Sequence, residues 1–249
     1  MIPKKIHYCW FGGNEPDEAV LKCIESWKKH CPDYEIIKWN EDNYDVFKHP
    51  YMKEAYEAGK WAFVADYARY DILYENGGIY FDTDVEVIRS LDDLLINTAF
   101  TGMENGYEVA TGLGIGSEPG TEIIKNLRDI YSEMHFKTDH GYDTTPCVEY
   151  TTRYLRQKGL KSEDIIQTVE GLTVYPKEYF CPVNAGSRRA KITENTYSIH
   201  HFAASWYQGG RITKEIKYRL IPVKKRMKRV VDGIFGDGTW KKIKVLMGK

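Results

Sequence analysis

The chain has 249 residues, of which 42% are hydrophobic, 29% charged and 14% aromatic, with a formal net charge of -1. This much apolar sequence can offset the entropy lost on folding, so the composition excludes a disordered, collagen-like or low-complexity protein. No segment approaches the ~20 uncharged apolar residues of a membrane span, and the N-terminus lacks a signal-peptide pattern, so we expect neither feature.

The first 40 residues predict a β-α-β unit. Residues 6–11 are aromatic and apolar and end at Gly12 and Gly13, which indicates a buried strand followed by a glycine turn. Apolar residues at helical spacing predict a helix over 16–30, and residues 34–39 predict a second strand. Such units favour a parallel sheet with helices on its faces, so the fold class expected is α/β.

The clearest predicted helix covers residues 61–76 and ends at Gly77, because glycine readily adopts the left-handed conformation that closes a helix. After Gly78, residues 79–81 form a short apolar strand that runs directly into Asp82-Thr83-Asp84. Acidic residues just beyond a buried strand lie at the carboxyl edge of the sheet, where open α/β sheets bind ligands. Further helices are predicted around 123–134 and 148–158, and a late strand over 197–202.

Charge is distributed unevenly along the chain. Residues 211–249 carry 13 Lys and Arg against 3 Asp and Glu, whereas residues 1–210 carry 22 against 33. We therefore expect one acidic domain over 1–210 that does not bind nucleic acid. Residues 211–249 predict a basic amphipathic helical tail, which either docks on an anionic membrane or packs on the acidic domain.

The five cysteines are odd in number, widely spaced and contain no Cys-x-x-Cys pair. They indicate reduced, mostly buried thiols rather than a zinc site or a disulfide framework. The expected location is the cytoplasm, with peripheral attachment to the inner face of the plasma membrane through the tail.

The chemistry is predicted from two pairs of side chains. Asp82 and Asp84 can place oxygen ligands near Mg²⁺ or Mn²⁺ and leave coordination positions for a diphosphate, although a lone Asp-x-Asp more often closes a turn. Asp66 and Arg69 lie three apart and share a helix face. They could form a structural ion pair, or offer an acceptor and five fixed donors to sugar hydroxyls or a phosphate.

Three blocks of sequence, in this order, closely resemble glycosyltransferase family 32, the transferases with a DXD sugar-binding region. They are Ile-Pro-Lys-Lys-Ile-His-Tyr-Cys-Trp-Phe-Gly from residue 2, Ala65-Asp66-Tyr67-Ala68-Arg69-Tyr70, and Leu73 to Asp84 with its Asn-Gly-Gly-Ile-Tyr-Phe-Asp-Thr-Asp ending. The match is strong over residues 1–95, patchy over 96–195, and returns at His200-His201-Phe202-Ala203-Ala204-Ser205-Trp206. Relatives of this family include α-1,6-mannosyltransferases and capsular polysaccharide transferases.

The resemblance implies a GT-A fold with one Rossmann-like nucleotide-binding domain, a mixed sheet, a nucleotide-sugar donor, Mn²⁺ or Mg²⁺, and retention of anomeric configuration. It assigns the following roles: Trp10 to the nucleotide base; Asp66 and Arg69 to the donor sugar; Asp82 to ribose, sugar or the metal's water shell; Asp84 to the metal; His200 or His201 as a further metal ligand; and Ser205 and Trp206 to the phosphates. Ala204 replaces a glycine usual in the family's last block. A tryptophan in the first strand is equally expected in the core, and adjacent histidines on a strand face opposite sides.

The resulting hypothesis is a hexosyltransferase that uses UDP-galactose or UDP-glucose and acts on a saccharide or lipid-linked oligosaccharide in surface polysaccharide synthesis. Glu104, Asp143 and Glu149 are the candidate acceptor contacts, each with a plain surface role as the alternative. A haloacid dehalogenase-type phosphatase or phosphotransferase also places Asp-x-Asp after a strand, but its signature needs threonine where this chain has Glu86. The other alternative is a non-catalytic nucleotide-sugar-binding protein.

Overall fold

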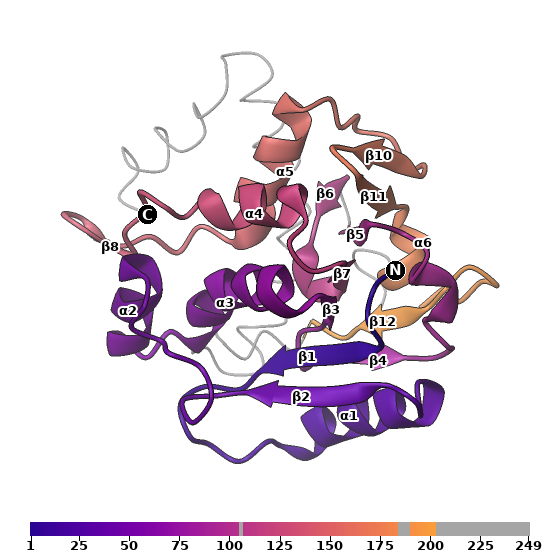
Figure 1. Ribbon diagram of the computed structural model, residues 1–249, viewed down its shortest axis with the longest axis horizontal. Helices are drawn as coiled ribbons and strands as arrows, with labels where there is room; N and C mark the ends of the chain where they lie inside the picture. Colours follow the sequence, from indigo (N-terminus) through magenta and orange to yellow (C-terminus); the bar gives the residue numbers. More distant parts are fainter. Residues whose placement is uncertain (105–106, 184–189, 203–249) are drawn as a thin grey trace. The chain divides into compact units, whose positions relative to one another are not determined.

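The computed structural model describes residues 1–104, 107–183 and 190–202 (Figure 1). The strands are β1 (Lys5–Cys9), β2 (Glu35–Trp39), β3 (Gly78–Tyr80), β4 (Val85–Val87), β5 (Ala99–Glu104), β6 (Glu108–Val109), β7 (Ile115–Ser117), β8 (Lys137–Thr138), β9 (Gly141–Tyr142), β10 (Gln167–Val169), β11 (Leu172–Tyr175) and β12 (Ser198–His200). The helices are α1 (Glu18–His30), α2 (Pro50–Glu57), α3 (Trp61–Asn76), α4 (Glu122–Asp129), α5 (Cys147–Gln157) and α6 (Lys177–Phe180), with single 3-10 turns η1 (Asp92–Leu94) and η2 (Thr111–Leu113).

The main sheet is mixed, with the strand order β10-β11-β5-β7-β3-β1-β2 and β6 paired to β5. Strands β2, β1 and β3 are parallel, which confirms the predicted β-α-β opening, whereas β7 runs antiparallel between β3 and β5. The helix predicted over 61–76 is confirmed as α3. The helix predicted around 123–134 ends at Asp129 and continues as turns, and α2 has no counterpart in the sequence prediction.

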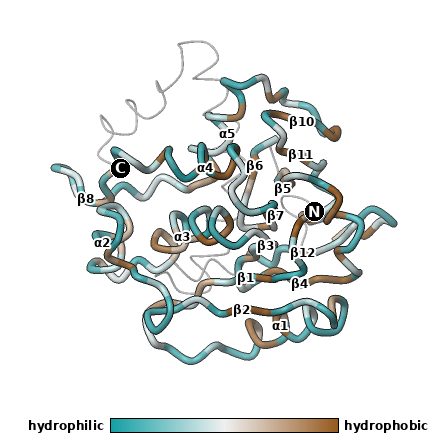
Figure 2. Tube along the Cα trace, viewed as in Figure 1, coloured by the Kyte–Doolittle hydropathy of each residue, from teal (hydrophilic) through white to brown (hydrophobic). Residues whose placement is uncertain are grey.

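Helices cover both faces of this sheet, and successive residues of β1 alternate between them. Ile6 and Tyr8 pack in the core beneath α1, together with β4 and α6, whereas Cys9 packs in the core formed with α2, α3, α4 and α5. Figure 1 shows α1 and α3 on opposite sides of β1. In Figure 2 apolar segments follow the strands and the covered sides of the helices, and the β8 hairpin is polar. The fold is therefore a layered α/β arrangement.

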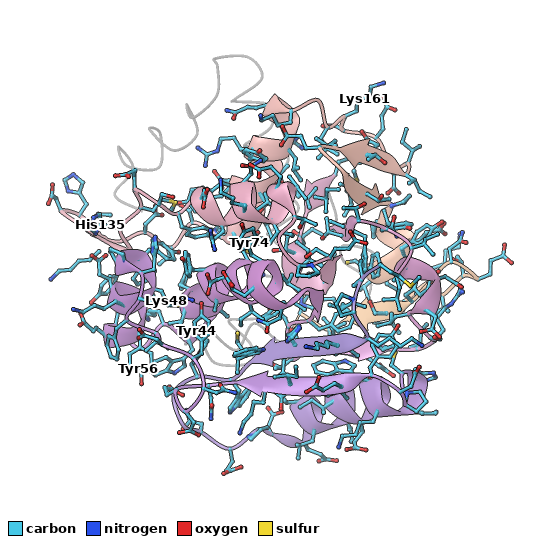
Figure 3. All side chains as sticks on the ribbon, in the orientation of Figure 1. Tyr44, Lys48, Tyr56, Tyr74, His135 and Lys161 are labelled. Carbon is cyan, nitrogen blue, oxygen red and sulfur yellow. The ribbon has the colours of Figure 1, made fainter. Side chains whose placement is uncertain are left out.

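Helix α3 is buried along most of its length, and polar contacts hold it in addition to packing. Asp71 provides the anchor: the Tyr44 hydroxyl donates to its Oδ2 (2.8 Å), Arg128 Nη1 donates to its Oδ1 (3.3 Å), and Lys48 forms an ion pair with it. Tyr44 and Lys48 lie beside each other in Figure 3, and the ammonium is 4.7 Å from the ring centroid. These contacts fix the helix that carries Asp66.

The turn between α3 and β3 is set by His7, which is fully buried in β1. Trp39 Nε1 donates to His7 Nδ1 (3.0 Å), so the neutral ring carries its proton on Nε2 and donates it to the carbonyl of Gly77 (2.8 Å). Gly78 has φ +97°, and a Cβ there would lie 2.7 Å from His7 Nε2. Burial lowers the pKa of His7 to about 4. The neutral imidazole therefore holds the turn from which β3 delivers Asp82.

Candidate active site at the end of strand β3

Two aspartates and a histidine converge where β3 ends. Strand β4 begins immediately after Asp84 and pairs with β12 so that His200 lies opposite Val85. One ligand atom from each of Asp82, Asp84 and His200 lies within 4.8 Å of the others, and His200 Nε2 is 3.0 Å from Asp84 Oδ1. The pairing of two strands distant in sequence thus assembles a three-residue cluster.

The electrostatics of the cluster centre on His200. Burial alone would lower the pKa of His200, but the charge of Asp84 and its hydrogen bond outweigh burial and raise it above the ordinary value. The other ring nitrogen, Nδ1, is buried and has no hydrogen-bond partner within the described ranges of the chain. Carboxylate oxygens with an imidazole are a donor set that suits Mn²⁺, and carboxylates suit Mg²⁺, so these residues fit a divalent cation.

The neighbouring histidine faces away from the cluster, as the alternation of a strand predicts. His201 Nε2 lies 2.9 Å from Glu86 Oε2, and the His201 side chain is 49% exposed against 14% for His200. Of the two histidines, His200 therefore lies beside the aspartates.

Helix α3 places Asp66 and Arg69 next to this cluster, and both side chains are buried. Arg69 Nη2 donates to Asp66 Oδ1 (2.9 Å) and to Asp82 Oδ1 (3.3 Å). The predicted shared helix face of Asp66 and Arg69 is therefore confirmed, and Arg69 links Asp66 to the cluster. Burial raises the pKa of Asp66 to about 6, although the Arg69 charge opposes the shift. Burial therefore makes this carboxyl easier to protonate than an exposed aspartate.

Three residues that the sequence analysis did not single out also border the site. Arg69 Nη1 donates to Thr111 Oγ1 (3.2 Å) and to Cys147 Sγ (3.5 Å), and Gly112 lies against the Asp82 carboxylate. The available signal was the run of glycines at 112, 114 and 116, since glycine within a strand region often marks a close approach. Thr111 and Cys147 left no sequence signal of their own.

Of the remaining predicted residues, Trp10, Glu104, Asp143 and Glu149 lie in the described part of the chain. Trp10 follows β1 at the same sheet edge, is partly buried against the core beneath α1, and donates from Nε1 to the Asn14 carbonyl (2.5 Å). The charge of Glu104 contributes to the raised pKa of His200, whereas Asp143 accepts from the Tyr150 hydroxyl (2.7 Å) and Glu149 lies in the first turn of α5. Ser205, Trp206 and residues 211–249 lie outside the described residues.

All five cysteines are buried, as predicted, and none forms a disulfide. None of the helices within the described ranges has the length and apolar character that a membrane span requires.

The α/β fold with its mixed sheet is a GT-A fold. The solved structure of the PaToxG glycosyltransferase shares this fold, with a TM-score of 0.50 and 17% identity over 64% of this chain and 69% of that one. Residues 17–101 match the family described as "Glycosyltransferase sugar-binding region containing DXD motif". This part of the chain is therefore similar to that family, which confirms the resemblance seen in the sequence.

Curated relatives match over about half of the chain. Inositol phosphoceramide mannosyltransferase 3 of Schizosaccharomyces pombe is 31% identical over 145 residues, 54% of this chain and 40% of its own length. Mannosyl phosphorylinositol ceramide synthase SUR1 of Saccharomyces cerevisiae is 35% identical over 143 residues, 55% of this chain and 36% of its own length. The chain thus spans about two fifths of the length of these relatives.

Proposed function

We propose that this protein transfers a hexose from a nucleotide sugar to a saccharide or lipid-linked acceptor, with a divalent cation and with retention of configuration. The observation that carries the proposal is the cluster of Asp82, Asp84 and His200 beside the buried pair of Asp66 and Arg69. This cluster offers ligands for a cation next to a carboxylate held in a fixed orientation. Transfer from a nucleotide sugar needs both features, one for the diphosphate and one for the sugar.

Each residue has a distinct part in this reaction. Asp84, with Asp82 and His200, would hold Mn²⁺ or Mg²⁺, and the bound cation supplies Lewis-acid stabilisation of the negative charge that develops on the leaving diphosphate. Asp66 accepts hydrogen bonds from hydroxyls of the donor sugar. Arg69 orients Asp66 and Asp82, because it donates to both.

Trp10 is proposed as the stacking surface for the nucleotide base. Trp10 follows β1, and β1 pairs in parallel with β3, which leads to Asp82. The base and the diphosphate would therefore lie along one edge of the sheet. Part of the Trp10 ring is accessible, and its N–H is already engaged by the Asn14 carbonyl. An aromatic face is the feature that remains for a planar base.

Turnover of nucleotide sugars tests the proposal. The full chain is incubated with Mn²⁺ and UDP-galactose, UDP-glucose or GDP-mannose, and release of the free nucleoside diphosphate is measured against an EDTA control. The mannosyl donor is included because the named relatives are mannosyltransferases. We expect metal-dependent release with at least one donor. Binding of nucleotide sugar and Mn²⁺ without turnover would instead favour a non-catalytic binding protein.

The phosphatase alternative is not favoured. Residues 17–101 match a sugar-binding family, and Asp82 is hydrogen bonded to an arginine that also holds Asp66. A phosphorylated Asp82 after incubation with a phosphoryl donor would reverse this assignment.

We further propose that residues 211–249 attach the domain to the anionic inner face of a membrane, where a lipid-linked acceptor in surface polysaccharide synthesis is available. The support is the local excess of ten positive charges in the sequence, since each basic residue near an anionic surface contributes about 1 kcal/mol. Co-sedimentation with anionic and neutral vesicles should separate the full chain from one ending at Gly210. A full chain that stays in solution with anionic vesicles at low salt would contradict this proposal, and loss of thermal stability on truncation would favour packing on the domain.

A further inference from the structure

We propose that Thr111 and Gly112, in the turn η2, are positioning residues that hold the Arg69–Asp82 pair in the orientation needed for cation binding. The inference rests on the proposed function and adds two residues to it. Both act through Arg69 and Asp82 and neither is proposed to contact the donor.

Arg69 makes hydrogen bonds from every nitrogen of its guanidinium. A guanidinium has five N–H donors, and the protein supplies five acceptors: the Ala65 carbonyl, Thr111 Oγ1, Cys147 Sγ, Asp66 Oδ1 and Asp82 Oδ1. The side chain is 3% exposed. Arg69 is therefore fully engaged within the protein, and its orientation depends on acceptors at both ends of the guanidinium.

Thr111 is the acceptor that further hydrogen bonds hold in place. Its hydroxyl, which is fully buried, also bonds the Tyr70 hydroxyl (3.1 Å), which in turn bonds Thr151 Oγ1 of α5 (2.8 Å). This chain of hydroxyls ties η2 to α3 and α5. A shift of Thr111 would release one end of the guanidinium, and the other end holds Asp82.

Gly112 lies directly against the Asp82 carboxylate. A Cβ built on Gly112 would lie 2.0 Å from Asp82 Oδ2 and 2.8 Å from its Cγ, and the other near atom is Oδ1 of the same group. The Asp82 amide also donates to the Gly112 carbonyl (3.0 Å). The absence of a side chain at residue 112 therefore creates the space in which this carboxylate lies.

Alanine substitutions at two glycines separate positioning from packing. At Gly116 the three atoms nearest to a Cβ all belong to the ring of Phe100, at 2.3 to 3.0 Å, and none belongs to the cluster. We expect Gly112→Ala to raise the Kd for Mn²⁺ about tenfold or more, because only a carboxylate must move. We expect Gly116→Ala to lower the Tm by several degrees through overpacking while its Kd for Mn²⁺ stays within about twofold of wild type.

A second set of variants tests Thr111 through Arg69. Thr111→Val should raise the Kd for Mn²⁺ and lower kcat by about tenfold, and Thr111→Ser, which keeps the hydroxyl, should restore both. Thr101→Val is the matched control, since the Thr101 hydroxyl is equally buried but donates to the Gly114 carbonyl. In an Arg69→Lys background Thr111→Val should add no further loss, because lysine lacks the fork that engages Thr111.

The experiment measures Mn²⁺ binding to the full chain by electron paramagnetic resonance, together with Tm and nucleotide-sugar turnover. Equal Mn²⁺ affinities of wild type and Gly112→Ala would overturn this inference but not the proposed function. So would a Thr111→Val loss that persists undiminished in the Arg69→Lys background. A wild-type chain that binds no Mn²⁺ would overturn the proposed function and this inference with it, whereas Mn²⁺ binding without turnover would contradict only the proposed transfer activity.

Discussion

Replacing His200 and His201 one at a time provides the sharpest test of the cation site. His200 supplies one of three candidate ligand atoms and is 14% exposed, whereas His201 is 49% exposed and pairs with Glu86. Changes around a metal site commonly cost 10–100-fold in affinity, about 1.4 to 2.7 kcal/mol, so His200→Ala should weaken Mn²⁺ binding by at least tenfold. The exposed pair between His201 and Glu86 contributes at most about 1 kcal/mol to stability. His201→Ala should therefore leave Mn²⁺ binding unchanged.

The apparent affinity for Mn²⁺ should depend on pH differently in these two variants. The raised pKa of His200 means that the protonated ring, paired with Asp84, contributes stability that is fully present below pH 6.5 and is lost as pH rises through the folded-state pKa. A cation must displace that proton. Below the folded-state pKa, the apparent affinity for Mn²⁺ should therefore fall by up to tenfold per pH unit in wild type and in His201→Ala, with a shallower slope in His200→Ala.

Isothermal titration calorimetry with Mn²⁺ between pH 5.5 and 8 measures both effects, and proton release can be read from the dependence of the enthalpy on the buffer. Thermal melts without metal provide the control for folding. Equal losses of Mn²⁺ affinity in the two variants, or a steep pH slope that survives in His200→Ala, would refute the assignment of His200.

Three further outcomes are expected. Asp84→Asn should abolish metal-dependent turnover while the Tm changes by no more than a few degrees, and full activity of this variant or of wild type in EDTA would contradict the role of Asp84. Trp10→Ala should weaken binding of the nucleoside diphosphate more than it lowers stability, whereas deletion of a fully buried tryptophan would cost about 3 to 5 kcal/mol of unfolding free energy. The pKa of His7 is lowered to about 4, so the neutral ring contributes stability that is fully present above pH 6.5. That contribution should fall by roughly 3 kcal/mol as the pH drops to 4. Denaturant melts across this range should show a smaller fall for His7→Gln.

The part of the fold that positions Asp82 was predictable because its signals are local. The helix α3 ends where Gly77 takes φ +62°, and a three-residue apolar strand follows at once. Such turns depend on residue type within a few positions, so the sequence alone indicates them. The pairing of Asp66 with Arg69 follows from helical spacing for the same reason.

The residues that complete the site depend on contacts between distant segments. His200 reaches Asp84 because β12 pairs with β4, and Thr111 reaches Arg69 because β7 inserts antiparallel between β3 and β5. Strand order and register are not encoded in the local pattern of a two- or three-residue strand. The helix α2 was missed for a related reason, since eight residues beginning at Pro50 form too short a repeat to stand out.

The charges of the site account for its expected dependence on a cation. Among the described residues, Asp66 and Asp82 pair with the Arg69 guanidinium and Asp84 pairs with His200, so this part of the chain places an excess of negative charge at the site. A proton on His200 offsets part of that excess, which is why its pKa is raised despite burial. A diphosphate would meet net repulsion in such a site, because its own charge has the same sign and burial weakens screening. His200, Asp82 and Asp84 would hold a divalent cation, which would reverse that sign. We therefore expect the affinity of this site for a nucleotide diphosphate to depend on a cation that binds first or together with it.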